Sequence, residues 1–255
     1  MTTSKHLILG IFFSYLVGFT LYDDLIPLHF NNVDIDKPFF GGFNRPKIQW
    51  IDWDKDSDKD LYILDASGYL RYIENQGNLN TPDFHIITTE FQNIYCGSWF
   101  RFADYDGDDD LDLCAQNSEN YNQISYYQNS NGQLVYLGNL STSNGEFVVS
   151  SYVMTPTFAD IDNDGDEDFF TGNMIGTLTF YENIGIANEI PQFEYITNIW
   201  QNIYIIGGVR SEERHGASAI TFIDLDGDGD LDLSWGDYFQ QSLYIIWNSG
   251  TASVP

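Results

Sequence analysis

The chain is poor in positive charge. Its 255 residues include 10 lysines and arginines against 38 aspartates and glutamates, which gives a formal net charge of −28 at pH 7. Nucleic acids and anionic membrane surfaces attract basic proteins and repel acidic ones. We therefore expect no nucleic-acid partner and no attachment to anionic lipid.

Histidine is also scarce, and the motifs of several large enzyme classes are missing. His6 lies in an N-terminal apolar segment, and His29, His85 and His215 have no catalytic partner at a recognisable spacing. The sequence contains no nucleophile elbow, no zinc-protease helix and no phosphate-binding loop. We therefore expect a protein that is not an enzyme.

Cysteine occurs only twice, at Cys96 and Cys114. The two residues flank an acidic segment, so a local disulfide is conceivable in an oxidising compartment. Cys96 lies eight residues before that segment and Cys114 lies two after it, so a simple hairpin would not place them opposite each other. Two buried free thiols are an equally good interpretation.

Long helical periodicity is absent as well. Short aromatic and β-branched runs alternate with dense turn signals, which is typical of an all-β protein. Aromatic residues make up 16% of the chain, which is enough apolar material for a core. A disordered acidic chain is excluded on this ground.

What the sequence does contain is a nine-residue acidic segment that recurs four times. Each copy, called here an aspartate ladder, has aspartate at its positions 1, 3, 5, 7 and 9, and successive ladders start 52, 56 and 64 residues apart. In chain order, ladders 1 to 4 contain Asp52, Asp54, Asp56, Asp58 and Asp60; Asp104, Asp106, Asp108, Asp110 and Asp112; Asp160, Asp162, Asp164, Asp166 and Asp168; and Asp224, Asp226, Asp228, Asp230 and Asp232.

Such ladders are candidate calcium sites. Carboxylates this dense repel one another unless a cation lies among them, and calcium accepts about six to eight oxygen ligands in irregular loops. An EF-hand is excluded because it needs a glutamate at position 12 between two helices, whereas apolar runs flank these ladders. We expect up to four Ca²⁺ ions, with a metal-free solvated turn as the alternative for each ladder.

Four apolar runs accompany each ladder and predict four strands per repeat. The first strands are expected at 48–51, 100–103, 157–159 and 220–223, the second at 61–64, 111–115, 169–171 and 231–235, the third at 69–73, 123–127, 177–181 and 242–247, and the fourth at 84–88, 134–137 and 193–196. Each third run stops at an asparagine, and a glycine follows within three residues, as in a turn with positive φ. Four strands in about 50 to 65 residues is the size of a β-propeller blade.

One repeat reads FADIDNDGDEDF from Phe158 to Phe169 and GTLTFYEN from Gly176 to Asn183, and the run from Ile220 to Leu233 matches it. In ladder, asparagine–glycine turn and repeat length, these segments resemble the FG-GAP/VCBS repeat family, over roughly residues 40–250. The resemblance implies a β-propeller of four-stranded, calcium-binding blades of the integrin-α type. It also implies side-chain ligands from ladder positions 1, 3, 5 and 9, with the backbone carbonyl of position 7.

Propellers of this type usually close with about seven blades, and the chain has four ladders. We expect about four blades in residues 23–255, forming an open arc of a seven-bladed propeller in a longer chain, or a four- or five-bladed ring. Ladder 1 is expected to bind calcium most weakly, because Ser57 replaces the position-6 glycine and Lys55 and Lys59 add positive charge.

An apolar run over residues 7–21 follows Lys5 and His6, and predicts a signal peptide or an N-terminal anchor in residues 1–22. We therefore expect a secreted or cell-surface protein without membrane insertion after signal cleavage. The resemblance implies a structural, adhesion or ligand-binding module for an unidentified protein or glycan ligand on a surface. A non-catalytic carbohydrate-binding region of a larger secreted enzyme is the alternative. Trp99, Tyr152, Trp200 and Tyr204 could stack on a glycan, although packing within or between blades is favoured for them.

Overall fold

The computed structural model describes residues 28–30, 33–35, 43–151, 154–173, 175–204, 219–237 and 242–251. The chain divides into two compact units, Met1–Asn44 and Arg45–Pro255. In the first unit, β1 (Leu28–Phe30) pairs antiparallel with β2 (Val33–Ile35). The signal peptide or anchor expected in residues 1–22 lies outside the described residues. None of the helices within the described ranges has the length and apolar character needed to cross a membrane.

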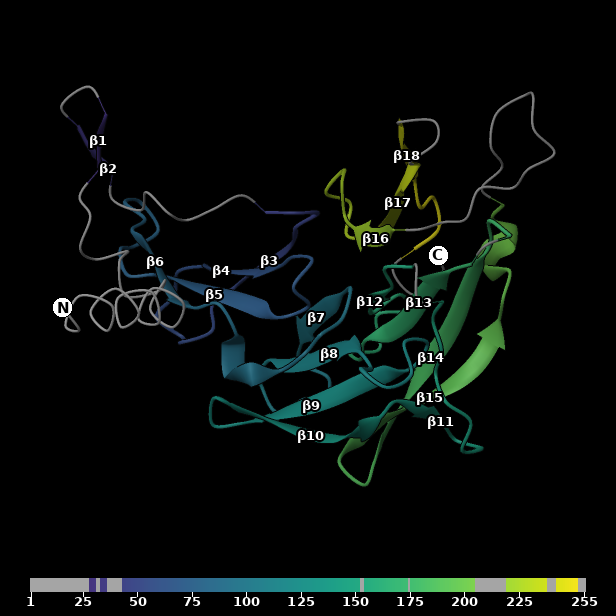
Figure 1. Cartoon of the computed structure of the whole chain (residues 1–255). Helices are drawn as coiled ribbons and strands as arrows, with labels where there is room; N and C mark the ends of the chain where they lie inside the picture. Colours follow the sequence, from purple (N-terminus) through teal and green to yellow (C-terminus); the bar gives the residue numbers. More distant parts are fainter. Residues whose placement is uncertain are drawn as a thin grey trace, which may run out of the picture. The chain divides into compact units, whose positions relative to one another are not determined.

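The described part of the second unit forms four β-sheets that follow one another along the chain (Figure 1). Sheet 1 contains β3 (Lys47–Ile51), β4 (Asp60–Leu64), β5 (Leu70–Asn75) and β6 (Phe84–Thr88). Sheet 2 contains β7 (Phe100–Ala103), β8 (Asp112–Gln116), β9 (Ile124–Ser130) and β10 (Gln133–Asn139). Sheet 3 contains β12 (Thr157–Ala159), β13 (Asp168–Gly172), β14 (Leu178–Ala187) and β15 (Ile190–Thr197), and β11 (Ser141–Thr142) pairs with β15 in parallel. Sheet 4 contains β16 (Ile220–Ile223), β17 (Asp232–Asp237) and β18 (Ser242–Ile246).

Within each sheet, consecutive strands are antiparallel neighbours. This is the strand order of a propeller blade, and the four sheets are called blades 1 to 4 below. In the described ranges, helical structure is limited to two short 3₁₀ turns, η2 (Phe91–Asn93) and η3 (Trp200–Asn202). The prediction of an all-β fold built of four propeller blades is therefore confirmed.

Apolar side chains hold each blade against the next. Cluster 1 joins blades 1 and 2 and includes Tyr62, Tyr72, Phe102 and Leu113, all nearly inaccessible to solvent. Tyr62 and Tyr72 stack with ring centroids 4.9 Å apart. Clusters 2 and 3 join blades 2 to 3 and 3 to 4 in the same way. Burying one such aromatic side chain contributes roughly 2–3 kcal/mol, so each blade depends on its neighbour for stability.

The expected strands are found at their predicted places, with two differences. The bounds of β6, β7, β12 and β16 agree with the prediction residue for residue. The third strands of blades 2 and 3 do not stop at Asn129 and Asn183, because pairing resumes beyond the turn and carries β14 on to Ala187. A turn glycine with positive φ was expected in every blade, and the structure has one at Gly132 in blade 2 and at Gly185 in blade 3. Gly77 is needed for close packing instead, because a Cβ there would lie 2.2 Å from a backbone oxygen.

Both cysteines are free thiols and both are buried. Cys96 belongs to cluster 1 and Cys114 to cluster 2, so the two sulfur atoms lie in the apolar layers on the two sides of blade 2. Of the two interpretations that the sequence left open, the structure supports the free thiols.

Gln49 links the first strands of blades 1 and 2. Its Nε2 donates to the backbone oxygen of Phe102 at 2.6 Å, and its Oε1 accepts from the backbone N–H of Phe102 at 2.9 Å. β7 is the edge strand of blade 2, so this side-chain amide pairs with backbone groups that no strand of blade 2 covers. The Gln49 amide thus acts as a short piece of sheet between two blades.

Replacing Gln49 by alanine should therefore destabilise the protein. We expect Gln49→Ala to lower the free energy of unfolding by about 1–3 kcal/mol, because both Phe102 backbone groups lose a partner. Urea denaturation measures this directly. Gln76→Ala is the matched control, since the Gln76 side chain is exposed and donates to nearby Glu74, and the substitution keeps its backbone bond to Asp83. Equal effects of the two substitutions would contradict the bridging role.

Candidate metal centres

Each aspartate ladder forms the hairpin loop between the first and second strands of its blade. The residue before position 1 pairs across the sheet with the aspartate at position 9, as in Ile51 with Asp60 and Ala159 with Asp168. Blades 2 and 4 have the same register. Position 9 is thus the first residue of the second strand, and positions 1 to 8 project beyond the end of the sheet.

The folded hairpins bring carboxylates together. In ladders 1 to 3, oxygen atoms from positions 1, 3 and 5 lie within 4.8 Å of one another, and in ladder 4 the group is formed by positions 1, 3 and 9. The members are Asp52, Asp54 and Asp56; Asp104, Asp106 and Asp108; Asp160, Asp162 and Asp164; and Asp224, Asp226 and Asp232. Position 7 belongs to none of these groups. Twelve of the predicted ligands are therefore gathered, and the remaining eight lie around them.

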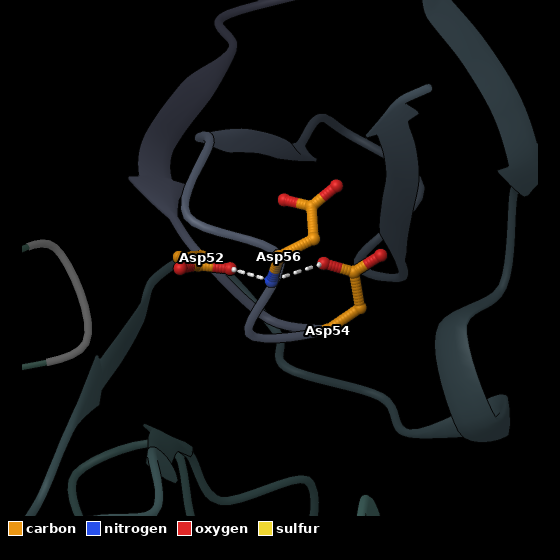
Figure 2. Close-up of side chains that lie close together, drawn as sticks. All are labelled: Asp52, Asp54 and Asp56. Atoms are coloured by element: carbon orange, nitrogen blue, oxygen red, sulfur yellow. Dashed lines mark hydrogen bonds between the residues drawn. The ribbon is translucent and has the colours of Figure 1, made fainter. Parts of the chain in front are cut away.

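Position 1 shapes the loop through backbone hydrogen bonds. In ladder 1, Asp52 accepts from the N–H of Asp56 at 3.1 Å (Figure 2), and also from the N–H of Ser57 at 3.0 Å. Asp160 accepts from the equivalent N–H groups in ladder 3 at 3.0 and 3.1 Å. These bonds curl the chain around the first carboxylate. The same curl places the oxygens of positions 3 and 5 beside it.

Position 5 continues the pattern. Its carboxylate accepts from the N–H of position 7 at 2.9–3.1 Å in every ladder. Each of these aspartates therefore has one oxygen fixed by the backbone and further lone pairs facing its neighbours. The anchor of position 5 is thus a backbone group in every ladder, whereas in ladder 2 the side chain of Gln128 also donates to Asp106 at 2.6 Å.

Position 9 is buried in all four ladders, with exposed fractions of 2% or less for Asp60, Asp112, Asp168 and Asp232. Its Oδ1 accepts from the backbone N–H of the turn asparagine, which lies in the third strand of blades 1 to 3 and two residues after it in blade 4. The distances are 2.9 Å from Asn75, 2.7 Å from Asn129, 2.8 Å from Asn183 and 2.8 Å from Asn248. The same asparagine accepts from a glycine N–H through its own side chain. The sequence identified these asparagines only as turn residues, and their role as partners of position 9 was missed.

The second oxygen of position 9 distinguishes the ladders. It accepts from the hydroxyl of Tyr72 at 3.1 Å in ladder 1 and of Tyr126 at 2.8 Å in ladder 2. In ladder 3, phenylalanine stands at the same distance before the asparagine, at position 180, and offers no hydroxyl. In ladder 4 Ile245 offers none either, but Oδ2 of Asp232 accepts from the backbone N–H of Leu225 at 3.1 Å. Oδ2 of Asp168 has no hydrogen-bond partner among the described residues.

Ladders 1 and 2 also hold a buried oxygen without a donor. These atoms are Oδ1 of Asp58 and Oδ1 of Asp106, so three ladders each bury one carboxylate oxygen that no described group satisfies. A buried acceptor without a partner costs roughly 1–3 kcal/mol, and more when it carries charge. A cation relieves this cost directly. The donor set therefore fits an oxygen-seeking metal ion.

Burial also shifts the titration of these carboxyls. Desolvation is the main cause that raises the pKa of Asp168 to about 8 and that of Asp112 to about 7, although Asn183 and Asn129 each donate a hydrogen bond that opposes the shift. For Asp168, the charges of Asp162 and Asp166 add to the rise. Without a cation, Asp168 is therefore mostly protonated at neutral pH, and Asp112 is protonated in part.

The backbone at positions 4 and 6 has positive φ in every ladder. The residues are Lys55 and Ser57, Gly107 and Asp109, Asn163 and Gly165, and Gly227 and Gly229, with φ between 60° and 101°. The sequence predicted this need at position 6 and missed it at position 4. Only ladder 4 meets it with glycine at both positions, whereas ladder 1 uses Lys55 and Ser57, for which a left-handed backbone costs roughly 1–2 kcal/mol each.

The sequence suggested that Lys55 would add its positive charge to its own ladder, but the side chain pairs with the next ladder instead. Its Nζ forms an ion pair with Asp110 of ladder 2 and donates to the backbone oxygen of Asp109 at 3.3 Å. The loops of blades 1 and 2 are therefore linked by a side chain. The hydrogen bond to Asp110 raises the pKa of Lys55, so the lysine stays charged.

Two of the four aromatic residues considered for a glycan-stacking surface are buried. Trp99 is 1% exposed in cluster 2, and Trp200 is 9% exposed in cluster 3. These two side chains pack between blades, as the favoured interpretation had it. Tyr204 is 46% exposed, and Tyr152 lies outside the described residues.

Relieving the backbone strain in ladder 1 should stabilise the protein. We expect Ser57→Gly to raise the free energy of unfolding by about 0.5–1 kcal/mol, because the relief at φ 80° exceeds the added freedom of the unfolded chain. Ser57→Ala is the matched control, since it removes the hydroxyl and keeps the Cβ. Urea denaturation in excess chelator separates the two, and an equal response would contradict the strain.

The metal-free protein should lose stability as the pH rises. The folded-state pKa of Asp112 and Asp168 lies above the unfolded value of about 4, so their contribution is fully present below about pH 4. It is lost as the pH rises through about 7 for Asp112 and about 8 for Asp168. We expect the Tm, measured on protein shown by elemental analysis to be metal-free, to fall from pH 5 to pH 9. Asp168→Asn should flatten the upper part of that fall, and an unchanged profile would contradict the assignment.

Comparison with known proteins agrees with this geometry. The chain matches the FG-GAP-like repeat twice, over residues 104–171 and 160–235. No curated protein sequence matches it. Among solved structures, it is similar to one described as the structural basis of specific recognition of non-reducing terminal N-acetylglucosamine by an Agrocybe aegerita lectin, with 18% identity and a TM-score of 0.43 over 82% of this chain. The chain spans 50% of the length of that structure. Because the two repeat matches together extend over residues 104–235, about half of its 255 residues, the chain belongs to the FG-GAP-like repeat family.

Proposed function

We propose that this protein is a non-catalytic, calcium-binding propeller module that acts outside the cell as a structural, adhesion or ligand-binding element. The observation that carries the proposal is the gathering of three carboxylate oxygens within 4.8 Å in each of the four ladders. The buried, unpartnered oxygens of Asp58, Asp106 and Asp168 support it.

An oxygen-only donor set favours calcium over the other common metal ions. Zinc and copper prefer nitrogen and sulfur ligands, and magnesium keeps several of its waters. The gathered atoms are all carboxylate oxygens, on short flexible loops that suit the irregular coordination of calcium. Up to four ions are proposed, one for each ladder.

The bound ion would supply positive charge where the carboxylates of one ladder converge. Position 1 directly follows the first strand of each blade and position 9 begins the second, so the ladder closes one hairpin. Position 9 also holds the asparagine at the end of the third strand. The carboxylates therefore connect three strands, and neutralising their repulsion stabilises the blade as a unit.

The proposed location is the cell surface or the extracellular medium. The family resemblance and the signal peptide or anchor expected in residues 1–22 support it, and calcium outside cells reaches millimolar levels that fill even weak loops. The partner is proposed to be a protein or glycan ligand on a surface. Nucleic acid is not proposed as a partner, because the net charge of −28 repels it.

Calcium should raise the thermal stability of the chain. A site occupied at about 100 times its Kd stabilises by about 2.7 kcal/mol, and each kcal/mol raises the Tm by about 2–4 °C in a domain of this size. We expect the Tm in millimolar calcium to exceed that in excess chelator by about 5–10 °C for each occupied site. An unchanged Tm, with metal removal confirmed by elemental analysis, would falsify the proposal.

Asp168→Asn isolates one ladder in the same experiment. We expect this variant to lose the calcium-dependent rise of one site without any loss of Tm in chelator, because the amide keeps the acceptor for Asn183 and is neutral, as the protonated carboxyl of Asp168 is. The matched control is Asp109→Asn, which removes an exposed charge outside the gathered groups.

Isothermal titration of the parent chain should show ladder 1 as the weakest site, and four equivalent tight sites would contradict that ranking.

A further inference from the structure

A lysine connects the first two aspartate ladders. Lys55, at position 4 of ladder 1, forms an ion pair with Asp110 of ladder 2 and donates from Nζ to the backbone oxygen of Asp109 at 3.3 Å. Both acceptors lie in the loop between β7 and β8 of the next blade. One side chain therefore joins two candidate metal centres.

The acceptors of the lysine are bonded to the gathered carboxylates of ladder 2. The N–H of Asp109 donates to Asp104 at 2.9 Å, and the N–H of Asp110 donates to Asp108 at 2.9 Å. Asp104 and Asp108 belong to the gathered group, whereas Asp109 and Asp110 do not. Fixing Asp104 and Asp108 on a shared ligand therefore fixes both acceptors of the lysine as well.

The donor lies among the gathered carboxylates of ladder 1. Lys55 stands between Asp54 and Asp56, two of the three residues whose oxygens meet in that loop (Figure 2). Its backbone has φ 62°, in the left-handed region that residues with a side chain adopt only at a cost. An ion pair that holds the end of this side chain helps to keep that backbone in place. The same contact therefore favours the loop shape in which Asp54 and Asp56 can share a cation.

A different residue anchors the base of the ladder 1 loop. Trp53, at position 2, packs edge-on against Phe102 of blade 2, with ring centroids 5.6 Å apart. Its backbone N–H donates to Asp60 at position 9, at 3.3 Å. The base of the loop is thus anchored without the lysine, which acts on the outer part of the loop.

The other ladders lack a lysine at this position. Position 4 is occupied in ladders 2 to 4 by Gly107, Asn163 and Gly227. Between ladders 3 and 4, a cavity of about 360 Å³ has Asn163 and the position-6 residue Gly229 in its wall. Lys55 spans the corresponding positions of ladders 1 and 2, because Asp109 is also at position 6. Ladders 3 and 4 therefore provide a comparison without the lysine bridge.

We propose that Lys55 couples the first two metal centres, so that occupation of ladder 2 raises the calcium affinity of ladder 1. An occupied ladder 2 holds Asp109 and Asp110 in place, these residues hold the lysine, and the lysine keeps the ladder 1 loop in its binding shape. Ladder 1 needs this support most, because its strained backbone makes it the weakest site. Coupling between two sites is reciprocal, so ladder 1 raises the affinity of ladder 2 by the same factor. The inference rests on the proposed calcium function.

The direction of the effect distinguishes the lysine from direct electrostatics. Two bound cations repel each other through space, so an ion in ladder 2 would by itself weaken binding in ladder 1. The lysine link acts in the opposite direction. Its size is that of one exposed ion pair, which corresponds to about two- to fivefold in affinity.

Isotope labelling reads the two ladders separately, because Trp53 is the only tryptophan within a ladder and Gly107 is the only glycine of ladder 2. The full chain is labelled with ¹⁵N-tryptophan and ¹⁵N-glycine, and calcium is titrated while the backbone amide resonances of these two residues are followed by NMR. Asp106→Asn removes a gathered charge from ladder 2 and keeps an acceptor for Gln128. We expect it to raise the calcium midpoint at Gly107, and to raise the midpoint at Trp53 about two- to fivefold.

Two comparisons assign the effect to the lysine. Asp162→Asn makes the same change in ladder 3 and should leave the Trp53 midpoint unchanged. In the Lys55→Met background, Asp106→Asn should no longer weaken binding at Trp53. In the background of Lys59→Met, which removes an exposed lysine of the same ladder, the weakening should remain.

The outcomes separate the coupling from the calcium function. If both amides respond to calcium and Asp106→Asn leaves the Trp53 midpoint unchanged, the coupling is overturned and the calcium function stands. A weakening that persists in Lys55→Met overturns the role of the lysine. If neither amide responds to calcium, the proposed function fails and the coupling fails with it.

Discussion

The buried carboxylate at ladder position 9 is the constraint on which each blade depends. It begins the second strand, closes the hairpin with the first strand, and accepts the N–H of the asparagine that ends or interrupts the third. A charge in this position is costly without compensation. The rest of the ladder places further carboxylates beside it, which makes the need for a cation greater. Fold and metal chemistry therefore share one set of atoms.

The sequence predicted the fold well because the ladder period and the strand pattern are local signals. It did not predict the hydroxyl partners Tyr72 and Tyr126, since these act across strands and aromatic residues are common in every blade. The left-handed backbone at position 4 was missed because Lys55, Gly107, Asn163 and Gly227 share no side-chain property. A signal for the tyrosines did exist, since each stands three residues before its asparagine.

Differences among the ladders show how a repeat can drift without losing its fold. The third ladder has Phe180 where the first two have a tyrosine, and the first ladder has no glycine at position 4 or 6. Each ladder keeps the backbone bonds made by positions 1, 5 and 9. Geometry set by main-chain donors tolerates substitution at its neighbours, so the loops keep their shape while their affinity for a cation can vary.

Each of the two interfaces of blade 2 contains one free cysteine, whose reactivity reports on that interface alone. Cys96 is sealed in the layer shared with blade 1 and Cys114 in the layer shared with blade 3, and burial raises the pKa of both thiols. A thiol reagent reaches either sulfur only when the corresponding layer opens. The order in which the two are modified therefore records which pair of blades separates first, without any label or added residue.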